Sequence, residues 1–335
     1  MMPATADRDA DLMLLLQRGL PLRPRPFARL GRAVRLTEDE VVARVAALLE
    51  TGVARRLGAV FESRGLGYDS TLAAADVPED KLPAAAARIV PATEVTHCYV
   101  RDGRPNLWFT VTAPAARLRA AVERLTDQLA PWPAFDMPAR RTFKIGVVLD
   151  PRAAAGLPPA SSASSVRPAR RRPPPAPLDA RERAIVRRLQ GSLPVTTAPF
   201  ACLAAELATT EAELLARLRA WQRSGVLRRV ALVLRHRAVG FRANAMCAWS
   251  VADDRLAAAG AALARSPLIT HCYERAPHPR FPCNLFAMLH AGTPPAARSA
   301  VAALAAGAGL DGGRLLFSTQ ELKKTSPSFF LEDAS

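Results

Sequence analysis

Apolar residues recur at three- and four-residue intervals over two segments of the chain, 37–51 and 210–224, and give each segment one apolar helical face. Each segment opens on a threonine, Thr37 or Thr210, that stands three residues before a glutamate. In this capping-box arrangement the two side chains satisfy each other's backbone amides, so both segments are predicted to be helices. Shorter helices are expected before them, at roughly 7–17, 27–33, 179–190 and 199–207. Three helices followed by a short strand pair, such as 56–62, outline a winged helix-turn-helix.

After each helical region the pattern changes to strands and helices in the order β-α-β-β-α-β. In the first half, strands are expected near 70–76, 94–101, 106–113 and 141–149, with helices near 79–90 and 115–130. In the second half, strands are expected near 243–251, 268–275, 283–291 and 313–320, with helices near 254–265 and 295–306. This order is typical of a ferredoxin-like antiparallel sheet with helices on one face only.

The two halves are copies of one module. Thr37-Glu38-Asp39-Glu40 returns as Thr210-Glu211-Ala212-Glu213, a shift of 173 residues. After one residue of slippage, Thr96-His97-Cys98-Tyr99 returns as Thr270-His271-Cys272-Tyr273. Chance does not preserve order across such matches, so the sequence indicates a duplication. The second copy can then cover the open face of the first sheet through an approximate two-fold axis.

Between the copies lies a segment whose composition cannot form a packed core. Residues 151–178 contain eight prolines and four serines together with Arg170-Arg171-Arg172, which predicts an extended tether. The chain is therefore expected to be α+β and to divide into five units. They are a winged helix-turn-helix at 1–68, a ferredoxin-like domain at 69–150, the Pro/Ala/Arg-rich linker at 151–177, a second winged helix-turn-helix at 178–241 and a second ferredoxin-like domain at 242–326.

Composition narrows the class of protein further. Half of the 335 residues are apolar, 23% are charged and no apolar run is long enough to cross a membrane, which indicates a soluble globular protein. No signal-peptide pattern is visible, so the expected location is the cytoplasm. The five cysteines are odd in number and lack Cys-x-x-Cys spacing, which argues against disulfides and structural zinc. A net charge of +16 predicts an attraction for polyanions.

One repeated strand concentrates residues that are costly in a purely structural position. Because side chains alternate across a strand, a histidine, a tyrosine and an arginine share one face in each copy. They are His97, Tyr99 and Arg101 in the first copy and His271, Tyr273 and Arg275 in the second. The next strand adds Asn106 and Trp108 in the first copy, and Asn284 in the second.

These residues could form a hydrogen-bonded interface between the halves, although Val, Ile and Thr would form one at lower cost. The combination favours a site that stacks a flat aromatic ligand and binds its carboxylates, because an arginine side chain matches a carboxylate with two parallel hydrogen bonds. A second basic cluster, Arg235, His236 and Arg237, follows the second helix-turn-helix. It could be the rim of an anion pocket, a wing that meets DNA phosphates, or a solvated edge.

At these positions the sequence resembles the siroheme decarboxylases, an enzymatic branch of the Lrp/AsnC architecture. The matching stretches in the first copy are 56–61, 66–68, 96–102 and 106–110. Those in the second copy are 232–237, 240–241, 244–246, Trp249, 271–275 and 284–290. The second copy has Phe281, Cys283 and Phe286 where the family more often has Trp, Tyr and Tyr, so it lacks those hydroxyls.

The resemblance implies a fused two-subunit enzyme of haem d1 biosynthesis. It would remove CO2 from the acetate side chains at C12 and C18 of siroheme and give 12,18-didecarboxysiroheme. Catalysis would rest on His97 and His271, as proton donors or as an axial ligand to the substrate iron. Substrate binding would rest on Tyr99, Arg101, Asn106, Trp108, Arg235, His236, Arg237, Tyr273, Arg275 and Asn284.

The same resemblance sets the expected partners. They are siroheme and its mono- and didecarboxylated products, with no cofactor beyond the iron of siroheme itself and no membrane. The chain would be a pseudo-dimer by itself, and further homo-oligomers or contacts with other haem d1 pathway proteins are left open.

Two other functions compete with this one. An Lrp/AsnC-type transcriptional regulator would bind DNA through the helices at 37–51 and 210–224, but the first of these has a single basic residue, Arg44, and three acidic residues at its start. A tetrapyrrole carrier would bind siroheme without converting it. Nucleotide and ordinary hydrolase chemistry lack support, because the sequence has no Gly-rich phosphate loop and no Ser-His-Asp order.

Overall fold

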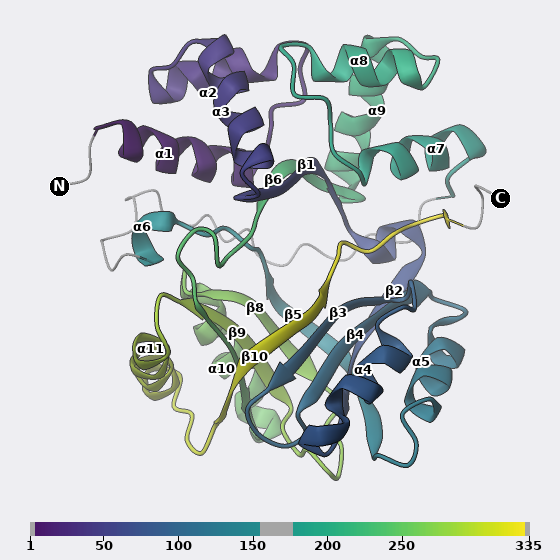
Figure 1. Ribbon diagram of the computed structural model, residues 1–335, viewed down its shortest axis with the longest axis vertical. Helices are drawn as coiled ribbons and strands as arrows, with labels where there is room; N and C mark the ends of the chain where they lie inside the picture. Colours follow the sequence, from purple (N-terminus) through teal and green to yellow (C-terminus); the bar gives the residue numbers. More distant parts are fainter. Residues whose placement is uncertain (1–3, 155–176, 332–335) are drawn as a thin grey trace.

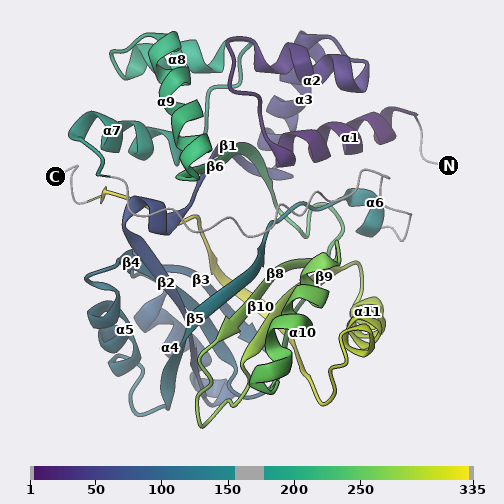
Figure 2. The same cartoon turned by 180° about the vertical axis from the view of Figure 1, so that it is seen from behind.

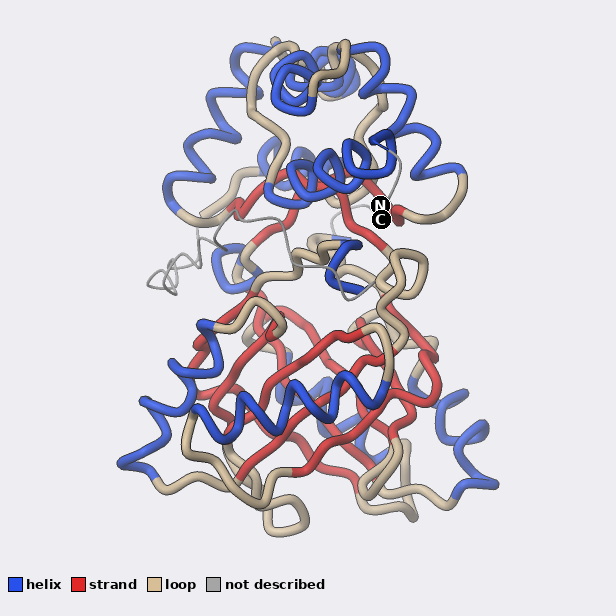
Figure 3. Tube along the Cα trace, turned by 90° about the vertical axis from the view of Figure 1, so that its left-hand side faces the viewer, coloured by secondary structure: helices blue, strands red, loops and turns tan. Residues whose placement is uncertain are grey.

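Helices from both copies form one layer of the molecule, and a closed β-barrel forms the other (Figures 1 and 3). The computed structural model describes residues 4–154 and 177–331. The expected duplicated α+β architecture is confirmed. Residues 155–176, which make up most of the predicted linker, lie outside the described residues. The start of that segment forms a short helix, α6 (Pro151–Ala154).

The helical layer contains three helices from each copy, as predicted. They are α1 (Ala4–Arg18), α2 (Pro26–Val34) and α3 (Glu38–Glu50) in the first copy, and α7 (Ala180–Leu189), α8 (Pro199–Glu206) and α9 (Glu211–Ser224) in the second. Both predicted capping boxes are present, with the Thr37 and Thr210 hydroxyls each accepting a hydrogen bond of 3.2 Å from a glutamate backbone N–H. The residues at which α3 and α9 begin are therefore determined by the local sequence.

The predicted wing is wrong, because each copy contributes one strand here rather than a local strand pair. Strand β1 (Ala54–Phe61) pairs antiparallel with β6 (Leu227–Leu234) of the other copy. After β1 the chain turns into the short helix η1 (Ser63–Leu66) instead of returning as a second strand. A single strand would leave its backbone N–H and C=O groups without hydrogen bonds. The pseudo-two-fold axis brings the equivalent strand of the other copy beside it, and the two strands pair.

The apolar faces of both copies meet in one core around the β1–β6 ribbon. Phe27 and Val41 of the first copy, and Phe200 and Leu218 of the second, are fully buried in this single cluster. Gly58 lies where a side chain would collide with the chain between α7 and α8, since an added Cβ would sit 2.3 Å from the Gly191 carbonyl oxygen. The helical regions of the two copies thus stabilise each other.

The barrel contains four strands from each copy in the predicted β-α-β-β-α-β order. The first copy gives β2 (Tyr68–Ala75), β3 (Val95–Arg101), β4 (Leu107–Pro114) and β5 (Ala134–Ile145). The second gives β7 (Ala243–Trp249), β8 (Ile269–Arg275), β9 (Leu285–Ala291) and β10 (Arg314–Lys324). The outer helices are η2 (Glu79–Lys81), α4 (Leu82–Ile89) and α5 (Leu118–Asp127) on one side and α10 (Asp253–Arg265) and α11 (Pro294–Gly307) on the opposite side (Figures 1 and 2).

Two long strands join the half-sheets, in the order β10-β3-β4-β2-β5-β8-β9-β7 around the barrel. Strand β5 pairs with β2 as far as Pro138 and with β8 of the other copy from Ala139 onward. Strand β10 pairs with β7 as far as Phe317 and with β3 of the other copy from Ser318 onward. The expected strand at 141–149 therefore begins earlier, at Ala134. Pro138 argues against a continuous strand because it lacks an N–H, and it stands where β5 changes partner.

Alternation along the strands separates two environments. Cys98 and Phe109 point outward into the core beneath α4 and α5. Trp108, Met137 and Phe281 belong to a cluster inside the barrel. Within the described ranges, no helix is long and apolar enough to cross a membrane.

Candidate functional site

His97 of β3 and His271 of β8 lie at the end of the barrel that faces the β1–β6 ribbon. Their side chains point into the barrel. Cys98 faces outward, so His97, Tyr99 and Arg101 face inward on β3, and the same reasoning applies to β8. The His97 and Tyr99 rings stack at 6.3 Å between centroids, and His271 and Tyr273 stack at 6.1 Å. The duplicated face predicted from the sequence is therefore present in both copies.

A neighbouring threonine orients each of the two histidines. His97 Nδ1 lies 3.0 Å from Thr96 Oγ1, and His271 Nδ1 lies 3.1 Å from Thr270 Oγ1. Each threonine hydroxyl donates to a backbone carbonyl, so its oxygen can accept from Nδ1–H. This tautomer leaves the Nε2 lone pair of each ring free to accept a proton or to bind a metal ion.

Two arginines are held inside the barrel without a carboxylate partner. Arg101 donates to the Leu316 carbonyl oxygen at 3.0 Å, and Arg275 donates to the Met137 carbonyl oxygen at 2.8 Å. The Nε of each guanidinium is buried and has no hydrogen-bond partner, and among the described residues neither guanidinium forms an ion pair. Burial lowers the pKa of each arginine to about 10. An uncompensated buried charge is costly, which identifies both positions as anion-binding candidates.

Two more histidines and a lysine lie near His97 and His271 at the barrel mouth. Lys324 Nζ lies 2.8 Å from His236 Nδ1, and the His236 and His290 rings contact edge to face at 5.5 Å. His236 was expected at the site, and His290 was not among the residues assigned to it. Lys324 was missed, because the last strand was expected to end at residue 320 and instead extends through Lys324.

All four histidines of the mouth are neutral at physiological pH. Burial, together with the nearby Lys324 ammonium, lowers the pKa of His97 to about 3. Burial likewise lowers the pKa of His236 and of His271 to about 4, and it holds the pKa of His290 well below its usual value. Neutral rings can accept protons or ligate iron, and they become acids when nearby anions raise their pKa.

Asn106 and Asn284 have a structural role that the sequence interpretation did not foresee. The Asn106 side chain accepts from Val77 N–H at 3.0 Å and donates to the Val77 carbonyl at 2.8 Å. Asn284 makes the same pair of bonds with Val251. Both amides thus bind the chain that leaves β2 or β7 rather than a ligand.

We expect Asn106→Ala to lower the free energy of unfolding by about 2 kcal/mol, because the buried Val77 backbone groups lose their partners. Tetrapyrrole affinity should change less than about threefold, and Asn284→Ala should behave alike. Urea unfolding and titration with iron-uroporphyrin III would measure the two effects. Unchanged stability together with a tenfold loss of affinity would restore the ligand-binding role.

The remaining predicted residues divide between the barrel floor and the rim. Trp108 is buried, donates to the Pro105 carbonyl at 2.7 Å and packs edge to face on Phe281, so it fills the floor. Arg235 and Arg237 are exposed and flank the buried His236 at the rim.

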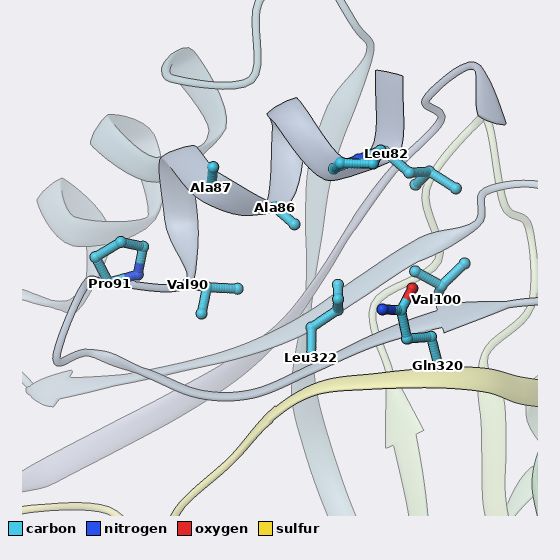
Figure 4. A pocket seen from close by; sticks show the side chains of 9 residues that line it. Leu82, Ala86, Ala87, Val90, Pro91, Val100, Gln320 and Leu322 are labelled. Atoms are coloured by element: carbon cyan, nitrogen blue, oxygen red, sulfur yellow. The ribbon is translucent and has the colours of Figure 1, made fainter. Parts of the chain in front are cut away.

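An apolar groove of about 450 Å³ lies outside the barrel, between α4 and the strands β3 and β10 (Figure 4). It is lined by Leu82, Ala86, Val90, Leu322 and their neighbours. At the matching place beneath α10 of the second copy, Phe143 of β5 packs on Gly260. The groove thus exists because Leu322 beneath α4 is smaller than Phe143 at the matching position. None of the candidate site residues lines it.

A helix-turn-helix layer above a duplicated ferredoxin-like sheet defines the Lrp/AsnC class of proteins. The AsnC-like ligand binding domain matches residues 65–144 and 238–323. The siroheme decarboxylase NirDL-like HTH domain matches residues 9–55 and 182–228. The chain belongs to the siroheme decarboxylase family.

Sequence relatives and solved structures support that assignment. The chain is 34% identical over 330 residues to the siroheme decarboxylase of Hydrogenobacter thermophilus, covering 96% of this chain and 95% of the relative. It is 42% identical over 147 residues to the siroheme decarboxylase alpha subunit of Desulfovibrio desulfuricans, which spans 43% of this chain and 85% of that subunit. The crystal structure of the siroheme decarboxylase NirDL matches with a TM-score of 0.72 at 29% identity, covering 97% of this chain and 95% of that one. A complex of NirDL with an iron-uroporphyrin III analogue matches with a TM-score of 0.71.

Proposed function

We propose that this chain is a siroheme decarboxylase of haem d1 biosynthesis that removes CO2 from the acetate side chains at C12 and C18 and releases 12,18-didecarboxysiroheme. Family membership supports the reaction class. The observation that carries the proposal is the pair of buried guanidiniums, Arg101 and Arg275, each with an unpartnered Nε. Siroheme carries eight carboxylates around a planar ring, and it is the kind of anion that such a pair would bind.

The arginines would bind carboxylates that do not react. A guanidinium offers two parallel N–H groups to a carboxylate, and this geometry fixes the position of the ligand as well as its charge. Tyr99 and Tyr273 lie beside these arginines, with each guanidinium over the phenol ring at 5.4 and 4.9 Å. The rim arginines Arg235 and Arg237 would attract the remaining carboxylates on approach.

The histidines would supply the proton. When the bond between the acetate methylene and its carboxyl carbon breaks, CO2 leaves and the conjugated macrocycle holds the electron pair. One proton then converts the methylene to a methyl group, so each step consumes one proton and needs no oxidant. The substrate carboxylates would raise the pKa of His97 or His271 toward the working pH and allow an imidazolium to donate. Because Nδ1 is held by a threonine, the other ring nitrogen, Nε2, would carry this proton or bind the substrate iron.

Anaerobic incubation of the protein with siroheme tests this function. We expect the tetrapyrrole mass to fall by one and then two CO2 units, with CO2 release in step. A carrier would return siroheme unchanged at full occupancy, which would contradict the proposal.

The regulator alternative loses support at the predicted DNA-contacting helices. Arg44 of α3 is bound to Asp9, Arg217 of α9 pairs with Glu182, and Arg219 donates to the Leu22 carbonyl. These side chains would have to leave their present partners before they could contact phosphates. A gel shift with salt titration should show no site-specific binding, and tight specific binding would favour the regulator.

A further inference from the structure

The barrel mouth has two poles that the duplication should make equal. We name them by their histidines. The His97 pole is formed by His97, Tyr99, Glu321, Lys324, His236 and Arg55. His290 lies between the poles, because its ring contacts that of His236 at 5.5 Å and its Nδ1 lies 3.4 Å from Thr270 Oγ1, next to His271. The His271 pole is formed by His271, Tyr273, Thr142, Arg228 and Glu62. Comparison of matching positions shows how far they have diverged.

The first difference lies on the strands that flank the histidines. In register, Lys324 of β10 stands opposite His97, and Ile145 of β5 stands opposite His271. Lys324 reaches His236 at 2.8 Å, whereas Ile145 is 38% exposed and carries no charge. The strand position opposite the histidine therefore carries an ammonium group at the His97 pole and an apolar side chain at the His271 pole.

The second difference is the number of imidazoles. The repeat shift of 173 residues places His236 on Ser63, and the shift that carries Asn106 to Asn284 places His290 on Thr112. His236 lies 2.8 Å from Lys324 at the His97 pole, and His290 contacts both the His236 ring and the Thr270 hydroxyl. The buried Asn244 Oδ1, on the strand beside His290, has no partner in the described chain. The His97 pole thus has a second imidazole, His236, beside Lys324, whereas His290 lies between the two poles.

The third difference is the compensation of charge. At the His271 pole, Arg228 forms an ion pair with Glu62, and the nearby Arg64 pairs with Asp69 at 2.8 Å. The same shift of 173 residues converts Glu62 to Arg235. It also converts Asp69 to Arg242.

At the His97 pole these positions therefore carry positive charges where the His271 pole has ion pairs. Arg55 lies close enough to Arg235 for the two to repel, and Arg237 acts in the same way on Lys324. Within the described residues the one acidic group of this pole is Glu321, which lies 3.8 Å from Lys324. The excess positive charge of the mouth is concentrated here.

We infer that the two poles have different tasks: the His97 pole holds the acetate that loses CO2 and delivers its proton, whereas the His271 pole only binds carboxylates. The inference rests on the proposed function. The His97 pole combines two proton-accepting rings, His97 and His236, with more cations than acidic groups, and this excess charge attracts an anion. At the His271 pole Glu62 neutralises Arg228, and the strand position opposite His271 carries no charge.

Matched substitutions separate the poles. His97→Gln should lower the rate of CO2 release about a hundredfold or more, the usual contribution of a general acid. His271→Gln should weaken binding of iron-uroporphyrin III and lower kcat less than tenfold. Lys324→Ile, which copies the other pole, should lower kcat about tenfold and shift the pH-rate profile, and Lys324→Arg should restore both. Ile145→Lys is the reciprocal control and should leave kcat unchanged.

Binding of iron-uroporphyrin III by each variant shows that it is folded. Equal losses of kcat in His97→Gln and His271→Gln, or a wild-type pH-rate profile in Lys324→Ile, would overturn the assignment of tasks. If the wild-type protein releases no CO2 from siroheme, the proposed function itself fails.

Discussion

Arg101→Met should make the empty protein more stable and its tetrapyrrole binding weaker, two effects of opposite sign. The buried guanidinium has no carboxylate partner, so replacing it with an apolar side chain of similar length should raise the free energy of unfolding by about 1–3 kcal/mol. The same change removes charge-assisted hydrogen bonds to a ligand carboxylate, worth about 1.5–3 kcal/mol, and should weaken binding by about 10- to 100-fold. Arg275→Met should behave in the same way.

Urea unfolding of the empty protein and titration with iron-uroporphyrin III measure both quantities. Arg119→Met is the control, since Arg119 is exposed on α5 in an ion pair with Glu123 and should affect neither. A loss of stability in Arg101→Met would mean that the hydrogen bond to the Leu316 carbonyl outweighs the cost of burying the charge.

Acidification should destabilise the empty protein over the range in which free histidines titrate. The pKa values of His97, His236, His271 and His290 are all lowered in the folded state, so the unfolded chain binds more protons below pH 6.5. The stability contributed by neutral burial is complete above about pH 6.5 and is lost as the pH falls toward the folded pKa values of about 3 to 4. Each ring adds about 1.4 kcal/mol per pH unit to the slope.

Denaturant midpoints between pH 7 and pH 5 would reveal this slope. His290→Asn should reduce the pH dependence of the free energy of unfolding by the contribution of one titrating group, whereas Arg119→Met should leave this dependence unchanged. A midpoint that does not move across this range would show that the four rings are already protonated, or solvated, in the folded protein.

Local chemistry made much of the fold predictable. The capping boxes at Thr37 and Thr210 depend on residues three apart, and the inward face of His97 and Tyr99 follows from strand alternation alone. The duplication was visible because two copies of one sequence can be compared directly. It also predicted that each open sheet face would be covered by the other copy.

Features that depend on distant pairing were not predictable in the same way. Nothing in residues 54–61 distinguishes a local wing from a strand that pairs with its own duplicate. The start of β5 at Ala134 was not predicted, because strand patterns do not reveal a change of partner in mid-strand such as the one at Pro138. The amide of Asn106 looked available for a ligand until its bonds to Val77 were known. Lys324 reaches the site through the far end of β10, beyond the expected strand.

The two strands that change partner also decide which copies can assemble. The C-terminal part of each long strand, β5 or β10, pairs with a strand of the other copy. In β10 this part ends at Lys324, which lies beside His97 of the first copy. Two first copies would put Ile145 beside both His97 residues, and two second copies would contain no His97 at all. Only the mixed pair brings His97, His236 and Lys324 together. A single polypeptide fixes that pairing at a one-to-one ratio and a high effective concentration, and it removes the competition from like-with-like dimers that separate subunits would face.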